Sequence, residues 1–163
     1  MQQIVSRLGI GVAVTAIGMW AADSSLGTWK LNAAKSKSTS TNAIKSLTDV
    51  REATADGGVK STRTGQMADG TAINYSYSCK YDGKECPVTG AAWDVIVIKR
   101  VNANTTAFEI KKTGGKLHST GRSVVSQDGK TRTQTGKGTG ADGKPVLSTM
   151  IFEKQEQVVD GHS

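Results

Sequence analysis

The chain has 163 residues, the length of a single domain with one hydrophobic core. It contains 19 glycines, 2 prolines and only 5% aromatic residues, which favours short extended segments joined by tight turns over long helices. Lysine and arginine number 21 against 14 acidic residues, a net charge of +7. These basic residues are spread along the chain without a basic run or interleaved aromatic residues, so we expect no nucleic-acid partner.

The first 24 residues indicate a secretory signal peptide. Arg7 precedes an apolar run, Leu8 to Trp20, that is shorter than the about 20 residues needed to span a bilayer. The best small-x-small match is Ala22-x-Ser24, with cleavage after Ser24. We expect a signal peptide over 1–24, a barrel domain over 25–156, a disordered tail over 157–163, and a periplasmic or secreted protein without a membrane span.

Asp-Gly pairs recur along the rest of the chain. An Asp-Gly pair between alternating segments is a strong hairpin signal, because a type I′ turn needs positive φ at both central residues. Gly114-Gly115 and the segment 102–104 provide turns in the longest interval between pairs. The pairs are Asp56-Gly57, Asp69-Gly70, Asp82-Gly83, Asp128-Gly129 and Asp142-Gly143.

The segments between these turns alternate as strands do. In 71–81, for example, Ile73, Tyr75 and Tyr77 share one face. By contrast, 130–138 has no apolar residue, so its inner face must meet water or a polar cavity, or the strand must lie at an edge. We predict an all-β fold, an antiparallel up-and-down meander closed into an 8- to 10-stranded barrel, because closure removes exposed edges. The predicted strands are 27–32, 46–55, 59–67, 71–81, 84–88, 93–101, 105–112, 116–126, 130–138 and 146–154, with 33–45 as a loop or single helical turn over one barrel mouth.

The two cysteines flank one of the turns. With Asp82 and Gly83 as turn residues, Cys79 lies opposite Cys86 at a separation that permits a disulfide. Disulfides persist in exported proteins, so we predict this bond. Metal ligation and a reactive thiol are the alternatives, but the sequence offers no third ligand and no Cys-x-x-Cys spacing.

The segment Gly27-Thr28-Trp29 resembles the start of the first strand in the lipocalin and fatty-acid-binding superfamily. Together with Tyr81-Asp82-Gly83-Lys84 and Ser126-Gln127-Asp128-Gly129-Lys130, it is similar to a group of exported bacterial proteins with lipocalin-like (calycin-like) β-barrels. The resemblance implies that Trp29 closes one barrel end and that Lys154 is the basic residue covering its ring. The Thr-Asp-Tyr signature of true lipocalins is absent.

The chain offers no recognisable catalytic set. Its two histidines, His118 and His162, have no neighbouring ligands with metal-binding spacing, and no nucleophile elbow, zinc-protease motif or phosphate loop occurs. We therefore expect a protein that is not an enzyme and that uses no cofactor and no metal.

A barrel of this strand number encloses side chains or one small ligand. The resembled fatty-acid binders hold a carboxylate with interior arginine and tyrosine, which implies a site for a fatty acid or another anionic amphiphile. The alternative is that the arginines point outward, small side chains fill the interior, and the protein is a non-catalytic envelope or surface protein without an internal ligand. We expect a monomer or weak oligomer. The candidate ligand-binding residues are Arg63, Tyr75, Tyr77, Arg122 and Arg132.

Overall fold

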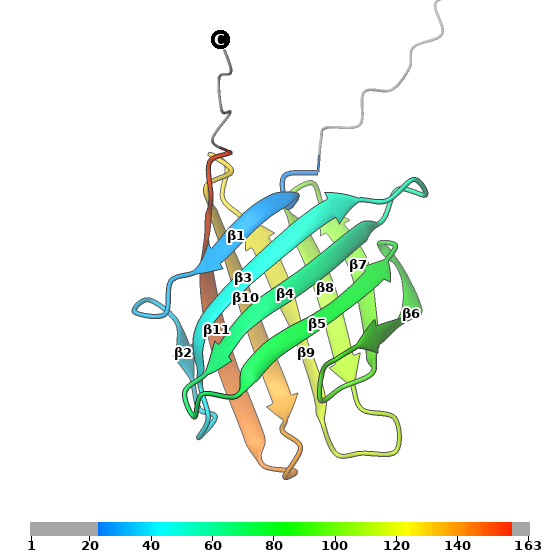
Figure 1. Ribbon diagram of the computed structural model, residues 1–163. Coiled ribbons are helices and arrows are strands. Elements are labelled where there is room, and N and C mark those ends of the chain that lie inside the picture. Colours follow the sequence, from blue (N-terminus) through cyan, green and yellow to red (C-terminus); the bar gives the residue numbers. More distant parts are fainter. Residues whose placement is uncertain (1–22, 158–163) are drawn as a thin grey trace, which may run out of the picture.

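The structure is a computed structural model that describes residues 23–157, and this part of the chain folds as one antiparallel β-barrel (Figure 1). Within it there is no helix, so none could cross a membrane. All ten predicted strands are present, with ends that differ by at most two residues. The strands are β1 (Gly27–Leu31), β2 (Lys37–Ser38), β3 (Ile44–Ala53), β4 (Val59–Met67), β5 (Ala72–Cys79), β6 (Asp82–Thr89), β7 (Val95–Asn102), β8 (Thr105–Lys111), β9 (His118–Val125), β10 (Thr131–Thr139) and β11 (Pro145–Lys154).

The sheet closes because the first strand pairs with the last. The strands follow one another in chain order from β3 to β11, and β1 joins β3 on one side to β11 on the other. The predicted closed up-and-down barrel is thereby confirmed. The prediction for 33–45 was incomplete, because this segment contains the two-residue strand β2, which continues along β11 where β1 ends.

The Asp-Gly turns are of a different type from the one predicted. In the described part of the chain no residue other than glycine has positive φ, which excludes type I′ turns. Between β4 and β5 the Gly70 amide donates to the Met67 carbonyl, and the Met67 amide donates to that of Thr71. This is a type I turn followed by a left-handed glycine, and Asp69 Oδ1 accepts the Thr71 amide at 2.8 Å. The glycines of all five Asp-Gly pairs have positive φ: Gly57, Gly70, Gly83, Gly129 and Gly143.

The predicted disulfide joins Cys79 to Cys86, whose Cα atoms are 5.6 Å apart. The expected turn at this hairpin was wrong in detail, because Asp82 begins β6 and lies opposite Lys99 of β7. Only two ladder pairs connect β5 to β6. The disulfide therefore holds together the least hydrogen-bonded junction between consecutive barrel strands.

Two apolar clusters form the hydrophobic core of the barrel. One consists of Val59, Tyr77, Cys79, Ile96 and Ile98. The other consists of Trp29, Leu47, Val125 and Phe152. Trp29 is fully buried, and its indole Nε1 donates to the Ser25 carbonyl at 2.9 Å, which satisfies the one polar atom of the ring.

Strand β10 shows why a segment without apolar residues can lie in the barrel wall. It is paired with β9 and with β11, so it is not an edge strand. Arg132 is buried, and Arg132 and Gln134 line an interior cavity. The inner face of this strand thus meets a polar cavity, the first of the two conditions that the sequence required.

Candidate functional site

Charged side chains from three strands meet inside the barrel. Because alternate residues of a strand share a face, Asp49 and Arg51 of β3 point inward, as does Arg63 of β4. Arg132 reaches the same place from β10. All four side chains are at most 6% exposed. They are the only buried charged residues in the described part of the chain.

Asp49 is the centre of this arginine cluster, which we define as Asp49, Arg51, Arg63 and Arg132. Its Oδ2 accepts from Arg132 Nη2 at 2.5 Å and lies 3.1 Å from Arg63 Nη2. Its Oδ1 accepts from the Ser61 hydroxyl at 2.6 Å. A buried carboxylate is tolerated only when it is paired and hydrogen-bonded, and Asp49 meets both conditions.

Arg63 is also held by neutral neighbours. Its Nη1 donates to the Tyr75 hydroxyl at 3.1 Å and its Nη2 to Gln134 Oε1 at 3.0 Å. Its guanidinium carbon lies 5.5 Å from the centroid of the Phe152 ring, a cation–π distance. Arg63 is therefore fixed in orientation by contacts to β5, β10 and β11.

Arg51 is the least engaged member of the cluster. Its Nη1 is 3.7 Å from Asp49 Oδ2, beyond hydrogen-bond reach, and donates only to the Tyr77 hydroxyl at 3.3 Å. The Nε atoms of Arg51, Arg63 and Arg132 are buried without a hydrogen-bond partner in the structure. The cluster thus has donor capacity that its own residues leave unused.

Three cations surround one anion, so the cluster carries two uncompensated positive charges. Burial opposes the ionisation of Asp49, but Arg63, Arg132 and Arg51 outweigh it and hold the pKa of Asp49 well below its usual value of 3.8. Burial, together with repulsion from Arg51 and Arg63, lowers the pKa of Arg132 to about 10 against the opposing attraction of Asp49. Although burial raises the pKa of Tyr77, Arg51 and Arg63 outweigh burial and lower it overall. The interior favours negative charge.

One cavity adjoins the arginine cluster, and a second lies next to the first. The first has a volume of about 200 Å³ and is lined by all three arginines together with Tyr75, Tyr77, Gln134 and apolar side chains such as Trp93 and Phe108. The second, of about 280 Å³, lies toward β2 and the start of β3. Both are lined by Ile44 and Met150, so these two side chains separate an arginine-lined chamber from one bounded by Leu31, Met67 and the 33–43 segment.

Four of the five predicted ligand-binding residues lie together in the interior: Arg63, Tyr75, Tyr77 and Arg132 line the first cavity. Arg122 does not join them. It is exposed, because on β9 Gly121 and Ser123 face inward and Arg122 therefore faces outward. Its assignment to the interior site is corrected on this ground.

Asp49 and Arg51 were not predicted as site residues from the sequence. Charged residues ordinarily face water, so a charged pair in a strand does not suggest an inner face. One feature of the sequence could have indicated their burial. Leu47, Asp49 and Arg51 occupy alternate positions of the same strand, so the two charged residues share a face with an apolar one.

The described residues contain no group of three or more His, Cys, Asp or Glu side chains arranged to hold a metal ion. His118 lies on the surface, 3.3 Å from Glu109. His162 lies outside the described residues. The cluster's chemistry, three guanidinium groups and phenol hydroxyls, suits recognition of an anion.

No protein-family model and no curated protein sequence matches the chain. Among solved structures, the fold is similar to a mutant of the fluorescent protein UnaG, with a TM-score of 0.53, 13% identity, and coverage of 82% of this chain and 98% of that one. It is also similar to the S-type phycobiliprotein lyase CPES from Guillardia theta, with a TM-score of 0.53, 11% identity, and coverage of 82% and 90%. These identities show the fold alone. The chain is a calycin-like β-barrel with an arginine cluster in its interior.

Proposed function

We propose that this barrel binds a small amphiphile with a negatively charged group, a fatty acid or a similar anion, without chemical conversion. The main support for this proposal is the excess of positive charge in the interior. Three arginines, Arg51, Arg63 and Arg132, surround the single carboxylate of Asp49. Burying an uncompensated charge costs several kcal/mol, about the scale of a buried ion's desolvation. A ligand anion offsets that cost.

The anion is placed beside Arg51. This arginine lines the first cavity, makes one hydrogen bond at 3.3 Å and lies 3.7 Å from Asp49, so its guanidinium is the least tightly held of the three. Arg63 has its Nη atoms engaged by Tyr75, Gln134 and Asp49. Arg51 and the Tyr77 hydroxyl are therefore the first contacts expected for a carboxylate.

The apolar part of the ligand is placed toward Ile44 and Met150. A ligand that displaces these two side chains connects the arginine-lined cavity to the 280 Å³ cavity beyond. Methionine is flexible and adapts its shape readily, which suits such a partition. Typical ligand pockets measure roughly 300–1,000 Å³, so these cavities fit a medium-length chain rather than a large ring system.

Matched ligands test the proposal. Dodecanoate and 1-dodecanol share the same alkyl chain and differ in the head group, and each is titrated into delipidated protein by calorimetry and by thermal melting. We expect dodecanoate to raise the melting temperature and dodecanol to leave it nearly unchanged, since a ligand stabilises in proportion to RT ln(1 + [L]/Kd). Equal stabilisation by both, or by neither, contradicts the proposal.

Variants of two arginines locate the site. Arg51→Met removes the proposed anion contact, and we expect the affinity for dodecanoate to fall about tenfold or more. Arg122→Met is the matched control, because this arginine lies on the outer face. Unchanged affinity in Arg51→Met, or an equal loss in both variants, argues against an interior anion site.

We also propose that the chain is exported to the periplasm or beyond. The Cys79–Cys86 disulfide supports this, since such bonds persist in oxidising compartments. Residues 1–22 of the predicted signal peptide lie outside the described residues. Intact mass of protein recovered from the periplasmic or culture fraction tests cleavage. It also distinguishes a cut after Ser24 from one that keeps Asp23, which accepts a hydrogen bond from Tyr81 at 2.5 Å.

A further inference from the structure

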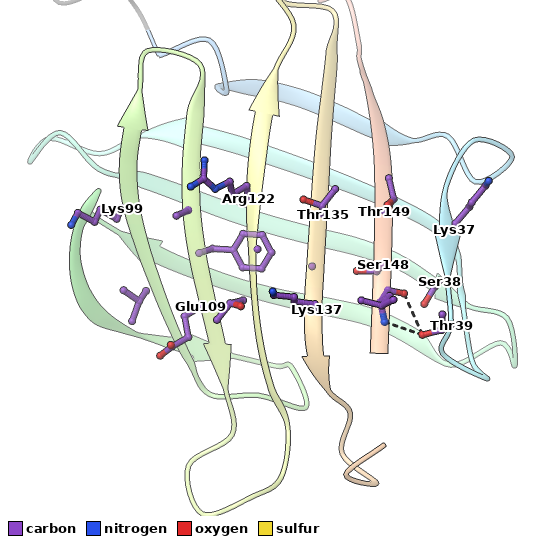
Figure 2. A pocket seen from close by; sticks show the side chains of 17 residues that line it. Lys37, Ser38, Thr39, Lys99, Glu109, Arg122, Thr135, Lys137, Ser148 and Thr149 are labelled. Carbon is purple, nitrogen blue, oxygen red and sulfur yellow. Dashed lines mark hydrogen bonds between the residues drawn. The ribbon is translucent and has the colours of Figure 1, made fainter. Parts of the chain in front are cut away.

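We propose that the outer face of strands β7 to β11, together with β2, binds an acidic polysaccharide chain. A groove of about 890 Å³ runs over this face (Figure 2), and it shares Lys37, Ser38 and Ser148 with the 280 Å³ cavity but no member of the arginine cluster. The inference does not depend on the interior ligand. It arises from how the barrel register arranges cations on the outside.

The groove is crossed by a row of outward side chains from six strands. In five of these six strands a neighbour of the row residue faces the interior and lines its cavity: Ile98, Phe108, Ser123, Gln134 and Met150. The row therefore points away from the barrel centre, and Figure 2 shows its labelled members running across the strands. By register the row is Lys99, Ala107, Arg122, Thr135, Thr149 and Lys37.

The cations of the groove are available for a ligand. Lys37, Lys99, Arg122 and Lys137 make no ion pair with any described residue. The one acidic residue of the lining, Glu109, lies 3.3 Å from His118. The groove thus has four cations against one carboxylate, and these charges have no partner of their own among the residues that the structure describes.

The outer face of β3 and β4 has a smaller excess of positive charge. Its exposed charged residues are Lys45, Glu52 and Lys60, and Glu52 lies directly across from Lys60 in the ladder. Opposite charges in such cross-strand positions attract each other. This face therefore has an excess of one cation, against three in the groove.

The spacing of the cations favours an extended ligand. Neighbouring strands lie about 4.8 Å apart, so Lys99 and Arg122, two strands apart, are separated by about 10 Å at their backbones, and Arg122 and Lys37 by about 14 Å. A single small anion cannot contact all three. A chain with regularly repeated negative groups can.

The lining between the cations identifies the polymer. It consists of small and hydroxyl side chains, among them Thr120, Thr135 and Thr149. No tyrosine or tryptophan lines the groove, and its one aromatic residue, Phe108, faces the interior, so the stacking surfaces that single-stranded nucleic acids need are missing. Strands β7 to β11 are each paired on both sides, and the one strand with a free side, β2, is only two residues long, which is too short an edge for an extended peptide to join. Hydroxyl groups and spaced cations match the hydroxyls and carboxylates of an acidic sugar chain.

Polygalacturonate, a carboxylated polysaccharide, is the probe for the test. Binding is measured by calorimetry at about 50 mM salt and repeated at increasing salt, with neutral dextran as the uncharged control. We expect polygalacturonate to bind, dextran not to bind, and the affinity to fall steeply with salt because several ion pairs form. Absence of polygalacturonate binding at low salt overturns the proposal.

A charge-matched pair of variants separates the groove from general electrostatics. Lys99→Gln/Arg122→Gln/Lys137→Gln removes three groove cations, and Lys30→Gln/Lys60→Gln/Lys84→Gln removes three cations elsewhere. We expect the groove variant to bind polygalacturonate about tenfold or more weakly and the control to change little. Equal losses in the two variants overturn the proposal. So does equally tight binding of poly-L-glutamate, which points to an acidic peptide, or of anionic phosphatidylglycerol vesicles, which points to a membrane.

Discussion

Arg132 Nη2 lies 2.5 Å from Asp49 Oδ2, and this contact links β10 to β3 across the barrel interior. The two residues are 83 positions apart in the chain, and their strands are not neighbours in the sheet. The Arg132 guanidinium also lies 4.5 Å from the Phe152 ring and 5.3 Å from the Trp29 ring. The contact forms only when the barrel has closed, so it reports on closure directly.

Replacing Asp49 by Asn removes the one anion that faces three buried arginines. We expect the free energy of unfolding to fall by about 3–5 kcal/mol, the usual cost of leaving buried charge without its partner. Urea unfolding at pH 7 measures this. The control is Glu85→Gln, which removes a surface carboxylate paired with Lys111 and should leave stability close to that of the wild type. A similar loss in both variants contradicts the buried charge count.

Removing one of the three cations should be far milder. Arg51→Met lowers the interior charge and replaces a guanidinium that is 3.7 Å from Asp49 by an apolar side chain of similar length. We expect a change in unfolding free energy within about 1 kcal/mol of the wild type, because well-packed apolar replacements of buried ions are often neutral. Urea unfolding checks this with Asp49→Asn alongside. A loss as large as that of Asp49→Asn shows that Arg51 is more firmly paired than its distances imply.

Acid should destabilise the barrel through Asp49. Its folded pKa lies well below the unfolded value of 3.8, so its contribution is fully present above 3.8 and is lost as pH falls from there toward the folded pKa. We expect roughly 2 kcal/mol or more of the acid loss to come from this group. Urea unfolding from about pH 7 to about pH 2 measures it across the window in which this carboxylate titrates.

The double variant Asp49→Asn/Arg51→Met supplies the comparison. It removes one anion and one cation, so the interior charge stays the same while the titrating carboxylate disappears. Its stability should fall less steeply with acid than that of the wild type. Identical slopes for the two proteins assign the acid sensitivity to other carboxylates.

The strand layout was predictable from the sequence because glycine turns and alternation both record local geometry. Gly70, for instance, must adopt positive φ to reverse the chain, and Ile73 and Tyr75 follow at the period of a strand. The turn type was not predictable in the same way. An Asp-Gly pair suits a type I′ turn or a type I turn with a left-handed glycine, and only the backbone distinguishes them.

The interior site was less visible in the sequence. Arg132 lies in a segment without apolar residues, and Arg122 is followed by Val124 and Val125, which fall on opposite faces, so neither pattern shows which face is inward. The strand pairing shows which face is inward, because Arg132 lies opposite the buried residues Phe152 and Val125. Asp49 and Arg51 were overlooked because a charge is expected to face water, and their burial depends on partners from distant strands.

Removing the disulfide should loosen one junction of the barrel. The Cys79→Ser/Cys86→Ser variant loses a short covalent loop for which the chain-entropy model gives at most about 2.5 kcal/mol. Because only two ladder pairs join β5 to β6, hydrogen exchange should accelerate in β6 while β9 and β10 stay protected. Exchange measured by mass spectrometry checks this. Uniform acceleration over all strands indicates that the bond stabilises the whole fold rather than this junction.

Two glycines that face each other across β9 and β10 should respond differently to alanine. A Cβ at Gly121 would lie 1.9 Å from the Thr135 carbonyl oxygen and 2.6 Å from Phe108 Cζ, so Gly121→Ala forces the backbone or the ring to move. We expect this variant to lower the free energy of unfolding by about 1–3 kcal/mol. A Cβ at Gly136 would meet two serine hydroxyls, at 3.3 and 3.4 Å, which can rotate away, and Phe108 Cζ at 3.7 Å, an ordinary van der Waals distance. Gly136→Ala should therefore be nearly neutral or slightly stabilising, since alanine restricts the unfolded chain. Thermal melting of both variants decides the matter, and equal losses would show that the space behind Gly136 is as tight as that behind Gly121.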